Sequence, residues 1–371
     1  MKSALSIAVV CFLLVLNAAA HVVESRRLDE DSDEDSDQGQ RMWFFVFGDS
    51  YADTGNFPNT GLSSKTRGWY PPYGSSDDAH DKQPTGRLSN GFVQPDFIAK
   101  ILGLDESPLA EGQRSGDNID HFSFGVNFAV GGAAVHEGAL FKVSLPEVTL
   151  SLQISRFSNL LAEGVIDNDL LDRSVALIAF SDGRDYGINS TIIDDAEVVS
   201  LTRDVTDWIV DGVTRLRKLG VKKVMVNTLP PLGCKPGWTR QNNYTACVSP
   251  ENVVPLYHNM YLRQKLSNLS ESGDVLLLDL HKIFTEIIHT PGRLGSQKWK
   301  RFYHKYTPCC ESTDPMGFCG QKDDYGEDQF TVCESPHMYF FWDDMHLTEA
   351  GYQAVVEELQ DSIKSFLDIS S

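Results

Sequence analysis

Long hydrophobic runs are scarce in this sequence. Only residues 3–20 form a continuous apolar stretch, and nothing after them is long and apolar enough to span a bilayer. This stretch follows Lys2 and ends in three alanines, a small-residue pattern typical of a cleavage site. We therefore predict a secretory signal peptide at residues 1–20 and a secreted, extracellular protein without stable membrane anchoring.

Positive charge is also in short supply, with 32 Lys and Arg against 52 Asp and Glu and a formal net charge of −20. This balance argues against a nucleic-acid partner, because phosphate binding needs clustered cations, and against an anionic membrane surface. Seven of the acids fall within residues 28–37, where there is no base. Since like charges repel one another, we predict an acidic flexible segment at 21–41, followed by one folded domain at 42–371.

Cysteines are few: there are seven, and Cys11 lies in the predicted signal peptide. The six that remain are Cys234, Cys247, Cys309, Cys310, Cys319 and Cys333. An even number in an oxidising compartment predicts up to three disulfides without fixing their pairing, although neighbouring Cys309 and Cys310 should each pair elsewhere. The absence of a Cys-x-x-Cys pair argues against zinc, and we expect neither a metal nor another cofactor.

Three Asn-x-Ser/Thr sequons begin at Asn189, Asn243 and Asn268. An exported chain would present them to glycosylation, so all three are candidate glycan sites. Any one of them can remain without a glycan.

Short apolar runs alternate with segments of helical periodicity. The runs predict buried strands at 43–47, 175–180, 224–226 and 275–278. The helical segments cover 201–216, 253–261 and a last helix that starts near Thr348. Such alternation predicts a single three-layer α/β/α domain, a parallel sheet flanked by helices. The active site of such a sheet lies at the carboxyl ends of its strands.

Two hydrolase patterns are missing. No Gly-x-Ser-x-Gly elbow of an α/β-hydrolase occurs, and no His-Glu-x-x-His of a metalloprotease. No glycine-rich loop of the phosphate- or dinucleotide-binding type is present either.

A serine lies directly beyond the first predicted strand, in Phe47-Gly48-Asp49-Ser50. At a helix start its hydroxyl would face the top of the sheet, where the helix dipole favours developing negative charge. The alternative is an ordinary N-cap serine, which is common at strand-to-helix turns.

A base and its orienting carboxylate precede the last helix. Asp343 and His346 are three residues apart, so the carboxylate can hold the imidazole Nδ1–H while Nε2 faces Ser50. Asp344 points elsewhere in this geometry and is expected to be structural. The alternative is a capping or ion pair without a catalytic role.

An oxyanion hole would need backbone N–H groups close to the substrate. The adjacent Gly131 and Gly132, which follow Asn127-Phe128-Ala129, let the main chain approach a ligand. Taken alone, this stretch is more typical of an ordinary glycine turn than of an oxyanion hole.

Together these three stretches resemble the GDSL family of serine esterases and lipases, the SGNH hydrolases. Pro84-Thr85-Gly86-Arg87, the run from Pro230 to Cys234, and Cys309-Cys310 further resemble its secreted plant branch. The resemblance implies an SGNH, flavodoxin-like hydrolase fold, a small ester or lipid substrate and no cofactor. It also implies roles for four residues: Ser50 as nucleophile, His346 as general base and acid, Asp343 as its orienter, and backbone N–H groups of Ser50 and Gly132 at the oxyanion.

One block departs from the family, which expects Gly-x-Asn-Asp after the second predicted strand with the Asn donating to the oxyanion. Here Asp182 stands at the Gly position and Arg184 at the Asn position. Arg184 either replaces the donor or pairs with Asp182 or Asp185, and loss of one donor lowers turnover about 10²–10³-fold.

The leading prediction is a monomeric, secreted serine esterase or lipase that forms an acyl-enzyme. One alternative is a catalytically impaired binding or defence protein with the same fold. Another is an acyltransferase that passes the acyl group to an alcohol. The aromatic and Pro-rich residues 68–74 either line an acyl groove or only stiffen a loop, and the second interpretation is favoured.

Overall fold

The structure is a computed structural model that describes residues 42–113, 124–136, 148–186, 195–289 and 301–369. The predicted signal peptide and acidic segment lie outside the described residues. Residues Trp43–Ser371 form one compact unit. Within the described ranges, no helix is both long and apolar enough to cross a membrane.

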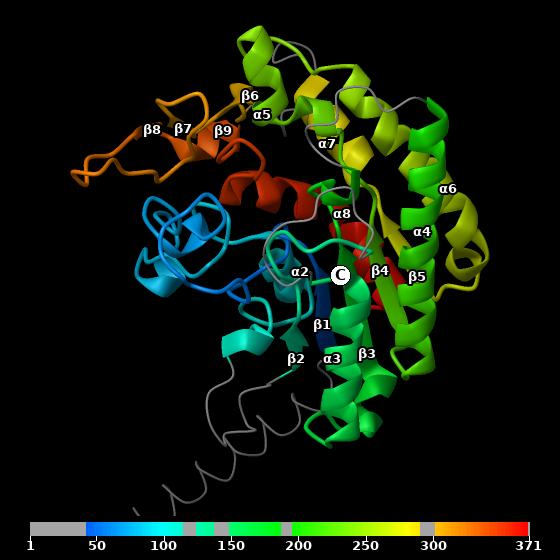
Figure 1. Cartoon of the computed structure of the whole chain (residues 1–371). Coiled ribbons are helices and arrows are strands. Elements are labelled where there is room, and N and C mark those ends of the chain that lie inside the picture. Colours follow the sequence, from blue (N-terminus) through cyan, green and yellow to red (C-terminus); the bar gives the residue numbers. More distant parts are fainter. Residues whose placement is uncertain (1–41, 114–123, 137–147, 187–194, 290–300, 370–371) are drawn as a thin grey trace, which may run out of the picture. The chain divides into compact units, whose positions relative to one another are not determined.

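A five-stranded parallel sheet forms the centre of this unit (Figure 1). Its strands are β1 (Trp43–Gly48), β2 (Gly125–Asn127), β3 (Ser174–Ala179), β4 (Lys223–Asn227) and β5 (Val275–Leu278). They lie in the order β2-β1-β3-β4-β5, the flavodoxin-like order. The chain moves outward from β1 to β2 and then returns to β3, so the order reverses beside β1. The predicted parallel sheet is confirmed, with β2 as an additional strand.

Helices cover both faces of the sheet. The α-helices of the described residues are α2 (Gln94–Ile101), α3 (Leu150–Ala162), α4 (Asp195–Lys218), the one-turn α5 (Pro236–Thr239), α6 (Val253–Glu271), α7 (Leu280–His289) and α8 (Glu349–Leu367). Because parallel crossovers are right-handed, the connections on the two sides of β1 lie on opposite faces. Accordingly α3, α4 and α6 pack together over one main core, while α2 and α7 pack on α8. This is the predicted three-layer fold.

The last helix begins where its sequence predicts. The Oγ1 of Thr348 accepts the N–H of Gly351 at 3.0 Å, which caps the first turn of α8. The segment just before this cap is therefore held at the start of α8.

A disulfide-rich region adjoins the sheet domain. It contains β6 (His304–Pro308), β7 (Cys310–Ser312), β8 (Phe330–Val332) and β9 (Tyr339–Phe341), which pair as two small two-stranded sheets. The disulfides join Cys234 to Cys247, Cys309 to Cys333 and Cys310 to Cys319, so the adjacent cysteines do have different partners. Half-cystines and Trp342 build a small separate core here.

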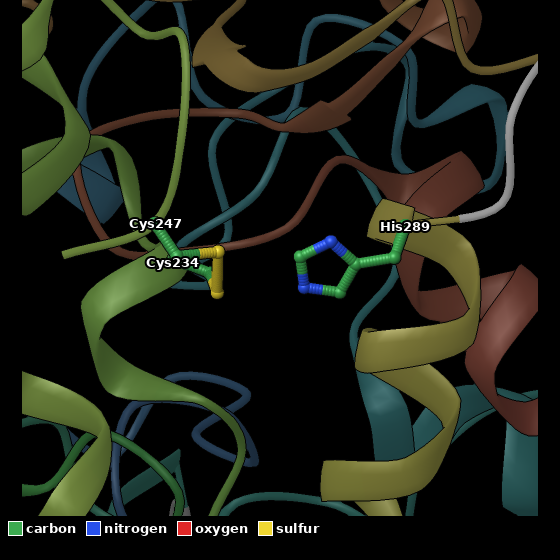
Figure 2. Close-up of side chains that lie close together, drawn as sticks. All are labelled: Cys234, Cys247 and His289. Atoms are coloured by element: carbon green, nitrogen blue, oxygen red, sulfur yellow. A yellow bond between two sulfur atoms is a disulfide. The ribbon is translucent and has the colours of Figure 1, made fainter. Parts of the chain in front are cut away.

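One disulfide lies beside a histidine, as Figure 2 shows for Cys234, Cys247 and His289. The three side chains are close enough to suggest a metal site. Metal binding requires thiolates, however, and these two sulfur atoms are bonded to each other. In this oxidised form the group offers a metal only the imidazole.

Two of the three sequons can be located. Asn243 is exposed after a short 3₁₀ turn, and Asn268 is exposed on α6. Asn189 lies outside the described residues.

Candidate active site

Ser50 lies in a tight turn at the carboxyl end of β1 and is only 4% exposed. The N–H groups of Ala52 and Asp53 both donate to the carbonyl oxygen of Asp49 at 3.1 Å. No helix follows directly, because the Asp53 carboxylate binds the next N–H groups and Gly55 has a φ of +129°. The expected helix start at Ser50 is therefore wrong, and a helix dipole does not act there.

The three predicted catalytic side chains meet. Nε2 of His346 lies 2.9 Å from Oγ of Ser50. On the other side of the ring, Nδ1 lies 2.9 Å from both carboxylate oxygens of Asp343. The N–H groups of Met345 and His346 also donate to Oδ1 of Asp343, at 2.8 and 2.7 Å. This local turn is what brings an Asp and a His three residues apart face to face.

Two glycines follow β2 on the other side of Ser50. Gly132 has a φ of +73°, a left-handed conformation that an L side chain rarely adopts. The N–H of Gly131 donates to Oδ2 of Asp53 at 2.6 Å, which ties the glycine turn to the serine turn. Gly132 and Ser50 consequently line the same cavity.

Comparison with known proteins now gives the family. The family model of the GDSL-like lipase/acylhydrolases matches residues 44–359. The chain belongs to this family. Its relatives include three GDSL esterase/lipases of Arabidopsis thaliana. At5g03610 is 34% identical over 87% of this chain and 87% of its own length. At3g09930 is 32% identical over 86% of this chain and 88% of its own length. At2g36325 is 34% identical over 84% of this chain and 84% of its own length.

The predicted family and fold are confirmed by these matches. Membership places this protein among the ester hydrolases of the esterase/lipase type. The roles of individual residues rest on the geometry of the site itself.

The GDSL site holds Asp343 with two residues that the sequence did not reveal, Arg67 and Tyr73. Nη2 of Arg67 lies 3.1 Å from Oδ2 of Asp343 and 2.8 Å from Oδ1 of Asp344. The Tyr73 hydroxyl donates to Oδ2 of Asp343 at 2.8 Å. Asp344 thus faces away from His346 and pairs with Arg67, as a structural residue would.

These contacts set the charge of Asp343, which is completely buried. Burial alone would raise the pKa of Asp343, but the Arg67 guanidinium and His346 outweigh it and hold the pKa well below its usual range. The carboxylate therefore remains ionised beside the imidazole.

Arg184 lies against Gly132, where the family has its Asn. A Cβ built on Gly132 would be 3.4 Å from Nη1 of Arg184, and both residues line the Ser50 cavity. The carboxylates of Asp182 and Asp185 accept backbone N–H groups instead, from Arg184 and from Val135. Among the described residues, no carboxylate forms an ion pair with the Arg184 guanidinium. Of the two alternatives for Arg184, side-chain pairing with Asp182 or Asp185 is therefore not seen in the described part of the chain.

A buried carboxylate connects the ends of β1 and β3, where the strand order reverses. Oδ2 of Asp49 accepts the N–H groups of Ser181 and Asp182 at 2.6 and 2.8 Å, and Oδ1 accepts that of Tyr51 at 2.9 Å. Burial, and then the charge of Asp182, raise the pKa of Asp49 well above its usual value.

The cavity over Ser50 has a volume of about 300 Å³. Its walls are largely apolar and include Phe57, Leu88, Val130 and Val148. The aromatic residues of the 68–74 segment are not among them: Tyr73 is buried against Asp343, and Nε1 of Trp69 donates to the carbonyl of Phe57 at 2.7 Å. This segment stiffens and supports the site, which agrees with the favoured interpretation.

Proposed function

We propose that this protein hydrolyses carboxylic esters through a covalent acyl-enzyme, with Ser50 as the nucleophile. The observation that carries the proposal is the continuous chain of 2.9 Å contacts from Ser50 through His346 to Asp343. A serine hydroxyl is a weak nucleophile at neutral pH and needs a hydrogen-bonded base that is itself oriented.

In the first half of the reaction, Oγ of Ser50 attacks the ester carbonyl carbon and its proton passes to Nε2 of His346. The carbon–oxygen bond to the alcohol then breaks, and the alcohol leaves with the proton from Nε2. In the second half, water attacks the acyl-enzyme and gives its proton to Nε2. The carboxylic acid leaves as that proton returns to Oγ, so the enzyme is regenerated. Asp343 stabilises the imidazolium in both halves.

The oxyanion is bound by the backbone N–H groups of Ser50 and Gly132 and by the guanidinium of Arg184. This assignment is supported by the position of Arg184 against Gly132 and by the shared cavity. Donors aimed at the developing charge are usually the largest electrostatic contribution to acyl transfer.

The proposal includes export of a monomeric protein, with a signal peptide at 1–20, an acidic segment at 21–41 and a hydrolase domain at 42–371. Three disulfides support it, because such bonds persist in oxidising compartments. Exposed Asn243 and Asn268 are the glycan sites that this route would modify.

The test is a panel of p-nitrophenyl esters from acetate upward, with the wild type and Ser50→Ala measured side by side. We expect Ser50→Ala to lower kcat by about 10⁴–10⁶-fold while the circular dichroism spectrum is retained. Unchanged turnover in this variant would remove Ser50 from the mechanism. Added alcohol with product analysis separates hydrolysis from acyl transfer.

A second candidate is a binding or defence protein of this family that has lost useful catalysis, and the observation that favours it is Arg184 in place of the Asn. Arg184→Asn discriminates between the two. If the oxyanion hole lacks a donor because of Arg184, the substitution raises kcat strongly. If Arg184 is the donor, kcat stays the same or falls, and Arg184→Ala lowers it about 10²–10³-fold.

A further inference from the structure

A second cavity, of about 380 Å³, adjoins the Ser50 cavity. Asp182 and Met345 line both, and Met345 directly precedes His346. The Tyr51 hydroxyl donates to the Met345 carbonyl at 2.7 Å, which fixes the wall between the two cavities. The two cavities thus have part of their walls in common, at Met345 and Asp182.

Disulfides hold the walls of this second cavity. Cys310 and Cys319 both line it and are bonded to each other. Lys235 and Trp238 enter it from the segment that follows Cys234, which is fixed by its bond to Cys247. A pocket with rigid walls loses little conformational entropy when a ligand enters, so its shape is ready for binding.

The lining of the second cavity combines aromatic surface with one buried cation. Trp238 and Phe318 are half-buried and lie with Leu232 and Val254 around it. Half-exposed aromatic rings in a concave site suit a flat apolar group.

Lys235 is the buried cation and is 2% exposed. Its Nζ donates to the carbonyls of Ser181 and Asp182 at 3.2 and 3.1 Å. The ammonium also lies 4.9 Å from the centre of the Tyr51 ring. An ammonium has three donors, and among the described residues no oxygen or nitrogen acceptor takes the third. Burial lowers the pKa of Lys235 to about 8, so at neutral pH the group is mostly charged.

We infer that the second cavity binds one arm of the ester substrate, an aromatic group that carries an oxygen acceptor for Lys235. The inference rests on the proposed function, because it treats Ser50 as the point where the ester carbonyl is held. It assigns this protein to esters with an oxygenated aromatic arm rather than to simple aliphatic esters.

The test compares methyl butyrate, methyl 3-(4-hydroxyphenyl)propionate and 2-(4-hydroxyphenyl)ethyl acetate, with the released acid titrated at constant pH. We expect kcat/KM to be at least about tenfold higher for one aromatic ester than for methyl butyrate. Whichever aromatic ester is preferred assigns the cavity to the acyl or the alcohol arm. Equal or lower values for both would overturn the inference.

Trp238→Ala removes the aromatic wall and should lower the ratio of aromatic to aliphatic kcat/KM about tenfold, mainly through KM. The matched control is Tyr325→Ala, because Tyr325 is 92% exposed and lines neither cavity. The control should keep the wild-type ratio. A ratio that does not fall in Trp238→Ala contradicts the inference. If that variant fails to fold, Val254→Trp, which fills the cavity, must lower the same ratio.

Binding without catalysis separates this inference from the proposed function. In the Ser50→Ala background, calorimetric titration with methyl 3-(4-hydroxyphenyl)propionate and 2-(4-hydroxyphenyl)ethyl acetate should show binding of at least one, weakened about tenfold by Trp238→Ala. If such binding is found but the wild type does not hydrolyse the esters, only the proposed mechanism is contradicted. If hydrolysis depends on Ser50 but aromatic esters are not preferred, only the proposed role of the second cavity is contradicted.

Discussion

Two buried aspartates flank Ser50 and His346, the proposed nucleophile and base, and they differ in charge environment. Asp49 is 1% exposed and Asp343 is 0% exposed. Asp49 accepts backbone N–H groups and lies near the negative Asp182, so burial and that neighbour raise its pKa. Asp343 has the Arg67 guanidinium beside it, and its pKa is lowered despite burial.

The comparison teaches that burial alone does not decide the charge of a carboxyl group. Desolvation opposes ionisation in both residues, and the nearby cation decides the outcome. Asp343 is therefore suited to orient and stabilise the imidazolium of His346. Asp49 is suited to join two loops, since it binds N–H groups from both β1 and β3 ends.

The largest expected effect concerns the charge of Asp343 itself. Asp343→Asn should lower kcat about 10⁴-fold, because a neutral amide neither fixes the imidazole tautomer nor stabilises the imidazolium. The measurement is steady-state turnover of p-nitrophenyl butyrate. A loss below about tenfold would mean that turnover does not need an ionised carboxylate at Asp343. The different charge environments of Asp343 and Asp49 would then not matter for catalysis.

Removing the charge of Arg67 tests why the pKa values of Asp343 and Asp49 are shifted in opposite directions. Arg67→Met leaves Asp343 buried without its main partner and should lower the free energy of unfolding by about 3–5 kcal/mol at pH 7. The low pKa of Asp343 contributes stability above the unfolded pKa of about 3.9, and this is lost as the pH falls through the folded pKa. The free energies of unfolding of the wild type and Arg67→Met, measured in urea, should therefore become more similar as the pH is lowered toward 3.

The control for this experiment is Lys222→Met, which breaks an exposed pair with Asp172. It should change the free energy of unfolding by at most about 1 kcal/mol. A difference between Arg67→Met and wild type that does not vary with pH would show that the Arg67 charge does not act through Asp343.

Asp49→Asn tests the other aspartate and should have an intermediate effect. The amide keeps one oxygen acceptor but turns N–H groups toward backbone donors, which displaces the serine turn relative to Arg184. A shift of this kind lowers kcat about 10²-fold. Turnover of p-nitrophenyl butyrate measures it, and a loss as large as that of Asp343→Asn would place Asp49 in the same charge role.

The smallest effect is expected for Tyr73→Phe. The variant removes one hydrogen bond to Asp343 but leaves Arg67 in place, so the free energy of unfolding should fall by about 1 kcal/mol. Urea unfolding measures the loss, and kcat should change less than about tenfold. A loss equal to that of Arg67→Met would show that the hydroxyl, and not the cation, stabilises the carboxylate.

Much of the sheet domain follows from local sequence patterns. The apolar runs of β1, β3, β4 and β5 and the periodicity of α4, α6 and α8 are long enough to identify. The strand β2 is too short for this, and α3 carries serines that favour non-helical hydrogen bonding. Right-handed crossovers then supply the layers once the strands are known.

Part of the candidate site was likewise predictable from the sequence, and part was not. Asp343 and His346 belong to one turn and Ser50 follows a strand, so their meeting was predictable. The Tyr73 contact spans 270 positions in the sequence, and neither a periodicity nor a motif encodes such a contact. The turn at Ser50 was predicted wrongly because the Asp53 carboxylate competes for the N–H groups that a helix would use.

The central claim is that His346 activates the hydroxyl of Ser50. The most direct measurement is labelling with a fluorophosphonate, followed by mass spectrometry of the digested protein. We predict a single phosphonylated residue, Ser50, with no label in Ser50→Ala and labelling slowed strongly in His346→Ala. Label on another residue, or equal labelling of the wild type and Ser50→Ala, would contradict the account.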